Sequence, residues 1–156
     1  MIRRFKTLEG LTQDDFIAMK APHALLLIDV DNTLLSPYAK GIDDRSMAWI
    51  KAMSLNHEIL LCTNNFTKRQ FKVGADLKLP ILMKAFKPFP YRVKTYLKQQ
   101  KADPDSIVVV GDQVVTDVLL ALWLKRPYVL IKPIDTDKHW LTRMFRILES
   151  AVINDE

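Results

Sequence analysis

Short apolar runs that alternate with amphipathic stretches are the feature of this 156-residue chain that most limits its fold. The runs contain almost no polar residue, as expected for strands that are covered on both faces. They span residues 24–30, 58–63, 80–83, 106–111 and 128–132. Between them, apolar residues recur at helical spacing. The pattern predicts a doubly wound α/β fold, a three-layer sandwich in which helices cover both faces of a mainly parallel sheet.

The expected helices begin at residues that cap helices or follow a proline. They run from Asp43 or Asp44 to about 55, from Thr67 to about 78, from after Pro88 to before 103, over 116–125 and over 138–150. The composition, 49% hydrophobic and 26% charged, is that of a chain with a proper core. We expect one domain over residues 1–156, because a typical domain holds about 100–200 residues.

Several classes of protein are disfavoured by what the sequence lacks. The single cysteine, Cys62, cannot form an internal disulfide, so we expect a core residue in a reducing compartment. No apolar run approaches the ~18 residues of a membrane span, and the N-terminus lacks the apolar stretch of a signal peptide. None of the four glycines forms a dinucleotide-binding or P-loop motif. We therefore expect a cytoplasmic protein. Its histidines are expected at the surface or in loops, and Trp49 and Trp123 in packing contacts.

Polar side chains follow the apolar runs at the points where the expected strands end. They are Asp29 and Asp31, then Thr63, Asn64 and Asn65, then Lys87, then Asp112 and Asp117. Ligands of open parallel sheets bind at this edge. Either Asp29 or Asp112 alone is better explained as a helix cap. Both follow apolar runs directly, however, and a hard cation such as Mg²⁺ would compensate two poorly hydrated carboxylates.

The order and spacing of these residues resemble the four motifs of the haloacid dehalogenase (HAD) superfamily. The motifs are Asp29-x-Asp31-x-Thr33, Thr63, Lys87 and Gly111-Asp112-x-x-x-x-Asp117, and the likeness extends over residues 25–132. The closer likeness is to subfamily IIIA proteins of the YqeG type, which are similar to mitochondrial phosphatidylglycerophosphate phosphatase. It rests on residues 29–34 and 63–65, the Lys87-Pro88 pair and residues 111–117. The resemblance implies a HAD-like Rossmannoid core.

The resemblance also implies an activity: Mg²⁺-dependent hydrolysis of a phosphomonoester through an aspartyl-phosphate intermediate on Asp29. Asp31 would protonate the leaving oxygen and bind Mg²⁺ through its backbone carbonyl. Lys87 would neutralise phosphate charge and orient Asp29, and so contact both substrate and nucleophile. Asp29, Asp112 and Asp117 would hold the metal, and which of the last two binds it directly stays open.

The remaining motif residues are expected to bind substrate or to shape loops. Thr63 would hydrogen-bond a phosphoryl oxygen, and Asn64 would contact the substrate beside it. Asn65 would either contact substrate or hold the loop, two roles that we weigh equally. Asn32 and Thr33 would shape the turn after the first strand.

Motif spacing limits the kind of substrate. Thr63 follows Asp29 by 34 positions, and Lys87 follows Thr63 by 24. Neither gap has room for a separate cap domain of the kind that encloses small substrates in this superfamily. An open site suits a bulky substrate such as a phospholipid head group, a polymer end or a phosphoprotein. Phosphatidylglycerophosphate is suggested by the resemblance alone. A neighbouring subunit could also close the site, and the oligomeric state stays open.

Basic residues are concentrated in one segment. The chain carries a net charge of +5, whereas residues 66–101 hold ten lysines and arginines against one acid, Asp76, a net charge of +9. This segment could contact a phosphorylated metabolite, an anionic membrane surface or nucleic acid. A solvated helix face explains it equally well. Binding to a membrane surface would make the protein peripheral there.

Two alternative functions are carried forward. The first is a non-enzymatic module that binds nucleic acid or anionic lipid through the basic 66–101 segment. The second is a phosphorylatable receiver-like signalling domain, since receivers are also doubly wound and use acidic pairs with a lysine. Receivers carry the phosphorylated aspartate on a middle strand. Here Asp29 ends the first expected strand, so the receiver is ranked low.

Overall fold

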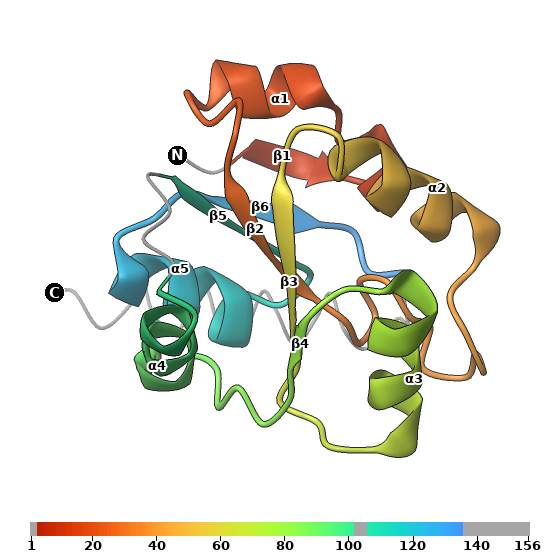
Figure 1. The fold of residues 1–156 in the computed structure, drawn as a ribbon. Coiled ribbons are helices and arrows are strands. Elements are labelled where there is room, and N and C mark those ends of the chain that lie inside the picture. Colours follow the sequence, from red (N-terminus) through yellow and green to blue (C-terminus); the bar gives the residue numbers. More distant parts are fainter. Residues whose placement is uncertain (1–2, 102–105, 136–156) are drawn as a thin grey trace, which may run out of the picture.

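A six-stranded parallel sheet forms the centre of the computed structural model, which describes residues 3–101 and 106–135 (Figure 1). The strand order is β1-β6-β5-β2-β3-β4, and every strand pair in it is parallel. The strands are β1 (Arg3–Lys6), β2 (Leu25–Asp29), β3 (Glu58–Cys62), β4 (Ile81–Leu82), β5 (Ile107–Gly111) and β6 (Tyr128–Ile131). All five expected strands are confirmed, and the sheet is entirely rather than mainly parallel.

The sixth strand, β1, was not expected from the sequence. It reads Arg-Arg-Phe-Lys and lies at the edge of the sheet, where it pairs with β6 through an irregular register. An edge strand pairs with one neighbouring strand only and is less covered than a central strand. Its sequence therefore need not contain a continuous apolar run. As a result, Asp29 ends the second strand of the chain and not the first, as the sequence had suggested.

The helices are α1 (Gln13–Ala18), α2 (Asp44–Met53), α3 (Lys68–Leu77), α4 (Tyr91–Gln99) and α5 (Leu119–Leu124), with a 3₁₀ turn at Leu8–Gly10. Asp43 caps α2, because its Oδ1 accepts a hydrogen bond from the Ser46 amide at 2.7 Å. The helix expected over 116–125 is shorter, because Val114–Val118 form a π-helix before α5 begins. The helix expected over 138–150 lies outside the described residues.

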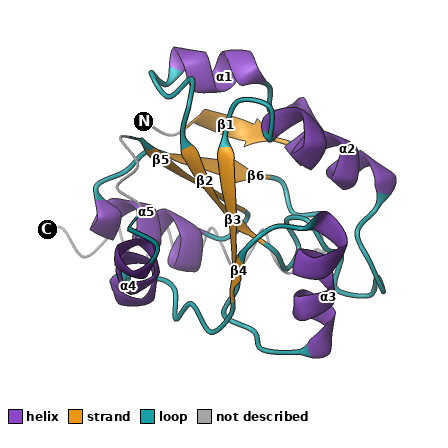
Figure 2. Ribbon diagram, viewed as in Figure 1, coloured by secondary structure: helices purple, strands orange, loops and turns teal. Residues whose placement is uncertain are grey.

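Helices cover both faces of the sheet, as Figure 2 shows. Side chains of β2 alternate between the two layers. Leu26 and Ile28 pack in the core formed with α1, α2 and α3, whereas Leu25 and Leu27 pack in the core formed with α4 and α5. Burial on both sides explains why the strand reads as an unbroken apolar run. The doubly wound three-layer architecture is therefore confirmed.

No cap domain separates the motifs. Every residue from Asp29 to Lys87 is described, and the helices and strands within that range are α2, β3, α3 and β4. Within residues 29–87, therefore, single helices, short strands and loops fill the two gaps between the motifs. Within residues 3–101 and 106–135, no helix has the length and apolarity needed to cross a membrane.

Two expectations about individual side chains are confirmed and one is wrong. His57 lies in the loop before β3, one of the two places expected for the histidines, although it is buried. Hydrogen bonds make its burial tolerable. Cys62 is a buried core residue, as expected. Trp123 is 59% exposed, not packed away. Trp123 lies on the last turn of α5, where it meets another exposed ring.

Candidate active site

The ends of the three central strands lie at one level. In the parallel register Asp29 pairs with Cys62 of β3, and Ile28 pairs with Val110 of β5. The residues that follow each strand therefore leave the sheet side by side. The acidic motif after β2, Thr63 after β3 and Asp112 after β5 meet at this carboxyl end. The loop after β4 brings Lys87 to the same place.

Three carboxylates and one lysine form the centre of the site. Asp29, Asp112 and Asp117 are buried, and each offers an oxygen within 4.8 Å of the others. Lys87 Nζ donates to Asp29 Oδ1 at 2.5 Å and to Asp117 Oδ1 at 2.7 Å. Thr33 Oγ1 donates to Asp112 Oδ1 at 3.2 Å. We refer to Asp29, Asp112, Asp117 and Lys87 as the charge cluster.

Burial and like charge shift the pKa values of the charge cluster. Burial raises the pKa of Asp29 well above its usual range, and Asp117 and Asp112 add to the rise, although Lys87 opposes it. Burial and the charge on Asp117 raise the pKa of Asp112 to about 6. Burial alone would lower the pKa of Lys87, but the carboxylates of Asp117 and Asp29 outweigh it and raise that pKa. The three carboxylates thus lie close together in a buried place, where solvent does not screen their mutual repulsion.

The charge cluster has the chemistry of a divalent-cation site. Three carboxylates face one ammonium group, which leaves two negative charges uncompensated when all are ionised. Asp112 Oδ2 is buried and has no hydrogen-bond partner among the described residues. A buried acceptor without a partner costs free energy, and a cation would remove that cost. The all-oxygen set of ligands suits a hard ion such as Mg²⁺.

Local geometry explains the Gly111-Asp112 pair and the position of Asp117. The Gln113 amide donates to Asp117 Oδ2 at 3.1 Å, so the π-helix folds Asp117 back toward the end of β5. A Cβ on Gly111 would lie 2.8 Å from the Cβ of Asp117, closer than real Cβ atoms come. Glycine at 111 is therefore what lets Asp117 lie over the strand end.

Asp31 is held apart from the three clustered carboxylates. Its Oδ2 accepts hydrogen bonds from Thr63 Oγ1 at 2.7 Å and from Asn65 Nδ2 at 2.9 Å. Its Oδ1 accepts one from Gln70 Nε2 at 2.7 Å. Three neutral donors therefore orient a carboxylate that lies at the edge of the charge cluster. In this structure the Thr63 hydroxyl serves Asp31, while its expected contact with a phosphoryl oxygen stays a prediction.

Asn64 contacts the backbone of Lys87 rather than open space. Its Nδ2 donates to the Lys87 carbonyl at 2.9 Å, and its Oδ1 accepts from the Lys87 amide at 2.7 Å. These two hydrogen bonds connect the loop after β4 to the end of β3, and so help to place Lys87 beside Asp29. The expected contact of Asn64 with substrate stays a prediction. Asn65 donates to Asp31, and the two roles considered for it, substrate contact and holding the loop, stay predictions.

Sequence reasoning did not identify Gln70 or the hydrogen bonds of Thr33 as part of the site. Gln70 lies three positions after Thr67, and this spacing is the capping-box pattern of a helix start. Thr67 Oγ1 does donate to Gln70 Oε1, while the Gln70 amide nitrogen reaches Asp31. The pattern indicated a helix start, but nothing in it indicated a contact with a residue 39 positions away.

The motif order along the sheet and the likeness to known proteins together define the class: the protein is a HAD-type phosphatase. A sequence model of the family described as "Mitochondrial PGP phosphatase" matches residues 4–132, and the chain belongs to that family. The comparisons favour neither the receiver-like domain nor the non-enzymatic binding module.

A curated relative agrees with this assignment, and a solved structure agrees with the fold. The chain is 25% identical over 130 residues to "Probable phosphatase YqeG" of Bacillus subtilis (strain 168), covering 83% of this chain and 76% of the relative. The crystal structure of a hypothetical protein from Xanthomonas campestris superposes with a TM-score of 0.56 at 19% identity. It covers 81% of this chain and 74% of that one, and it supports the fold alone.

Proposed function

We propose that the protein hydrolyses a phosphomonoester with Asp29 as nucleophile and Mg²⁺ as the required cation. The observation that carries the proposal is the buried charge cluster at the carboxyl end of the sheet, whose three carboxylates exceed its one lysine. Buried like charges are retained at a stability cost where catalysis or cation binding uses them.

In the first step, the carboxylate of Asp29 attacks phosphorus, and the ester P–O bond breaks. Lys87 donates to Asp29 Oδ1, which orients the nucleophile and offers positive charge to the phosphoryl group. Asp31, in its acid form, gives its proton to the leaving oxygen. We propose that a phosphoryl oxygen takes the place of Asp31 as acceptor for Thr63, which frees Asp31 to reach the leaving group.

In the second step, water hydrolyses the aspartyl-phosphate. Asp31 is now ionised and takes the proton of the attacking water, so the same group serves as acid and then as base. The acyl-phosphate bond breaks, inorganic phosphate leaves, and the Asp29 carboxylate is restored. Gln70, Asn65 and Thr63 keep the Asp31 carboxylate within reach of the reaction.

The cation would be held by Asp29, Asp112 and the backbone carbonyl of Asp31, with Asp117 binding it directly or through water. Asp112 Oδ2 is the strongest candidate ligand because it is buried and has no other partner in the described structure. Bound Mg²⁺ would neutralise the clustered carboxylates, keep Asp29 ionised and reduce the repulsion between these carboxylates and a phosphate dianion.

The substrate that we propose carries its bulk outside the site, because no cap encloses it. A phospholipid head group meets this condition, and the name of the matched family suggests phosphatidylglycerophosphate. Other bulky phosphomonoesters meet it as well, so the substrate is a matter for direct assay.

The test is a turnover screen with Mg²⁺ over phospholipid, nucleotide, sugar and polynucleotide phosphates, with a generic aryl phosphate as reference. Asp29→Asn should lower turnover of every accepted substrate by at least about 10³-fold while circular dichroism shows an intact fold. Thr95→Ala, an exposed change on α4, is the control and should leave turnover unchanged. Full activity in Asp29→Asn would overturn the mechanism.

A further inference from the structure

Four large rings lie exposed on the loops after β3 and β4 and on the last turn of α5. Phe66 is 63% exposed, Phe86 53%, Phe89 57% and Trp123 59%. We call these four residues the aromatic rim. A single exposed ring is ordinary, but a connected group of them marks a surface that something else covers.

The four rings are connected through side-chain contacts and short chain segments. The Lys84 ammonium lies 4.4 Å from the centre of the Phe66 ring, a cation–π contact. Lys84 begins the loop that carries Phe86 and Phe89, and the Phe89 amide donates to the Phe86 carbonyl at 3.0 Å. The Phe89 ring meets Trp123 edge to face, with centroids 6.2 Å apart. The aromatic rim thus runs from the end of β3 to α5.

The aromatic rim borders the charge cluster. Lys87 lies between Phe86 and Phe89 in the sequence, and its side chain points inward to Asp29 and Asp117. The two phenylalanine rings point outward into solvent from the same loop. One short segment therefore supplies the buried lysine and two of the exposed rings.

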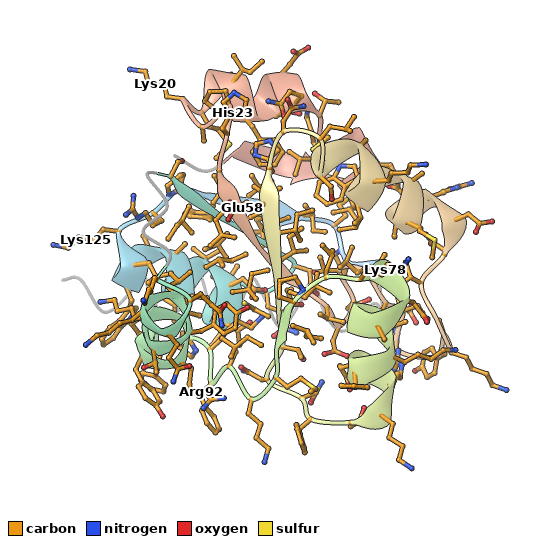
Figure 3. The ribbon with its side chains drawn as sticks, viewed as in Figure 1. Lys20, His23, Glu58, Lys78, Arg92 and Lys125 are labelled. Carbon is orange, nitrogen blue, oxygen red and sulfur yellow. The ribbon has the colours of Figure 1, made fainter. Side chains whose placement is uncertain are left out.

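Positive charge accompanies these rings. Lys68 and Lys84 are exposed beside the aromatic rim, and Arg92 is partly exposed at the start of α4. Figure 3 shows Arg92 at the lower edge of the molecule. Lys78 lies higher in the same view, at the C-terminal end of α3. Residues 66–101 hold ten basic residues and one acid, so little negative charge offsets them.

We propose that the aromatic rim and its flanking lysines dock on an anionic lipid bilayer. The rings would enter the boundary between head groups and acyl chains, and Lys68 and Lys84 would contact lipid phosphates. A second copy of this face is a poor partner, because its like charges would repel. Single-stranded nucleic acid would use the rings for stacking, but it has no use for the exposed aliphatic side chain of Leu122 beside Trp123.

Docking in this orientation turns the open side of the charge cluster toward the membrane. A phosphate carried by a lipid would then lie near Lys87 without leaving the interface. This consequence rests on the proposed function, whereas docking itself does not. The two can therefore fail independently.

The test is co-sedimentation of the full chain with phosphatidylcholine vesicles that contain or lack phosphatidylserine. The protein should bind the anionic vesicles, and the double variant Phe86→Ser/Phe89→Ser should bind at least about tenfold more weakly, because it removes two of the rings that would leave water on docking. The matched control is Ile17→Ser/Leu55→Ser, which removes two exposed apolar side chains elsewhere, 53% and 83% exposed, and should bind normally.

The charge contribution has its own pair of variants. Lys68→Glu/Lys84→Glu should weaken binding to anionic vesicles about tenfold or more, since basic residues near such a surface are attracted to lipid phosphates. Lys20→Glu/Lys51→Glu makes the same change in net charge at exposed residues after α1 and on the last turn of α2, away from the aromatic rim, and should have a much smaller effect.

Circular dichroism and thermal unfolding establish whether each variant is folded. If Phe86→Ser/Phe89→Ser does not fold, Phe66→Ser, which lies on a separate loop, tests the aromatic rim in its place. Asp29→Asn should bind vesicles as the parent does, so a loss of turnover alone concerns the proposed function. Absence of binding to anionic vesicles would overturn the docking proposal. So would unchanged binding of Phe86→Ser/Phe89→Ser, or binding to a single-stranded oligonucleotide in place of vesicles.

Discussion

The two ends of the parallel sheet bury polar groups in opposite ways. At the amino end, His57 is buried, yet its Nδ1 accepts from the Ala24 amide at 3.1 Å and its Nε2 lies 2.7 Å from Gln13 Oε1. At the carboxyl end, three buried carboxylates share one lysine, and Asp112 Oδ2 lacks a partner in the described structure.

The difference separates polar burial that supports the fold from polar burial that opposes it. Hydrogen bonds to the protein replace those that His57 would make to water, so its burial needs no further partner. The charge cluster is complete only when a cation joins it, so without one it lowers stability. This excess of charge is what makes the carboxyl end the candidate active site.

The largest effect should come from removing the lysine of the charge cluster. Lys87→Met leaves Asp29 and Asp117 without their shared partner, so the free energy of unfolding should fall by about 3–5 kcal/mol. Urea unfolding at neutral pH without Mg²⁺ measures it. Lys72→Met, an exposed change on α3, is the control and should stay within about 0.5 kcal/mol of the parent. Equal stability of the two variants would contradict the charge count given for the cluster.

The next effect is a pH dependence with opposite signs at the two ends. The pKa of Asp112 is raised to about 6, so between about pH 4 and 6 the folded state holds a proton that the unfolded chain has released. The contribution of Asp112 to stability should therefore fall as pH rises through this window, by on the order of 2–3 kcal/mol without Mg²⁺. Burial lowers the pKa of His57, so its contribution rises with pH below about 6.5.

Urea unfolding of the parent and of Asp112→Asn over this pH range separates the two contributions. The variant should lose the Asp112 part of the downward component, keep the part from Asp29, whose pKa is also raised, and keep the upward component from His57. Identical pH profiles for the two proteins would show that Asp112 is not strained in the folded state. Added Mg²⁺ should also flatten the downward component in the parent, because the cation competes with the proton for the carboxylate.

A smaller effect is expected where a neutral residue orients a charged one. Gln70→Ala removes the donor to Asp31 Oδ1, so kcat should fall by about tenfold through misplacement of the acid. Gln70→Asn should recover little of the lost kcat, because its side chain is shorter. Gln100→Ala, an exposed change after α4, is the control. A change in thermal stability with normal kcat would assign Gln70 a structural role only.

The smallest effect should come from the amino end. Gln13→Ala leaves the His57 Nε2 without its partner, so the free energy of unfolding should fall by about 1 kcal/mol. Turnover of an aryl phosphate should be unchanged, because the two ends share no hydrogen bond among the described residues. A fall in turnover at unchanged stability would break the separation between the ends.

Much of the fold was visible in the sequence, and the exceptions have physical reasons. The five central strands read as apolar runs because both of their faces are covered, as Leu25 to Ile28 illustrate. The edge strand β1 is short and charged, so no local sequence pattern predicted it. The start of α5 was placed too early because the π-helix that positions Asp117 has no signature distinct from an α-helix.

The residue types of the candidate site were also visible, but their contacts were not. Asp29, Asp112 and Lys87 stand out because each follows an apolar run, where a charge is unexpected. Gln70 and Asn64 carry no such mark, since polar residues are ordinary after a strand or on a helix. Their partners lie 39 and 23 positions away in the chain, and such pairs become neighbours only in the folded protein.

The sequence by itself determined the alternation of strands and helices, the edge where polar residues collect and the family to which they point. These depend on periodicity and polarity, which are properties of neighbouring residues. Tertiary structure alone decided that three carboxylates gather around one lysine, that Asp31 is hydrogen-bonded to neutral donors, and that exposed rings from three segments meet on the loop that carries Lys87. These depend on distances between segments far apart in the chain, which are set by strand register and by how the helices pack against the sheet.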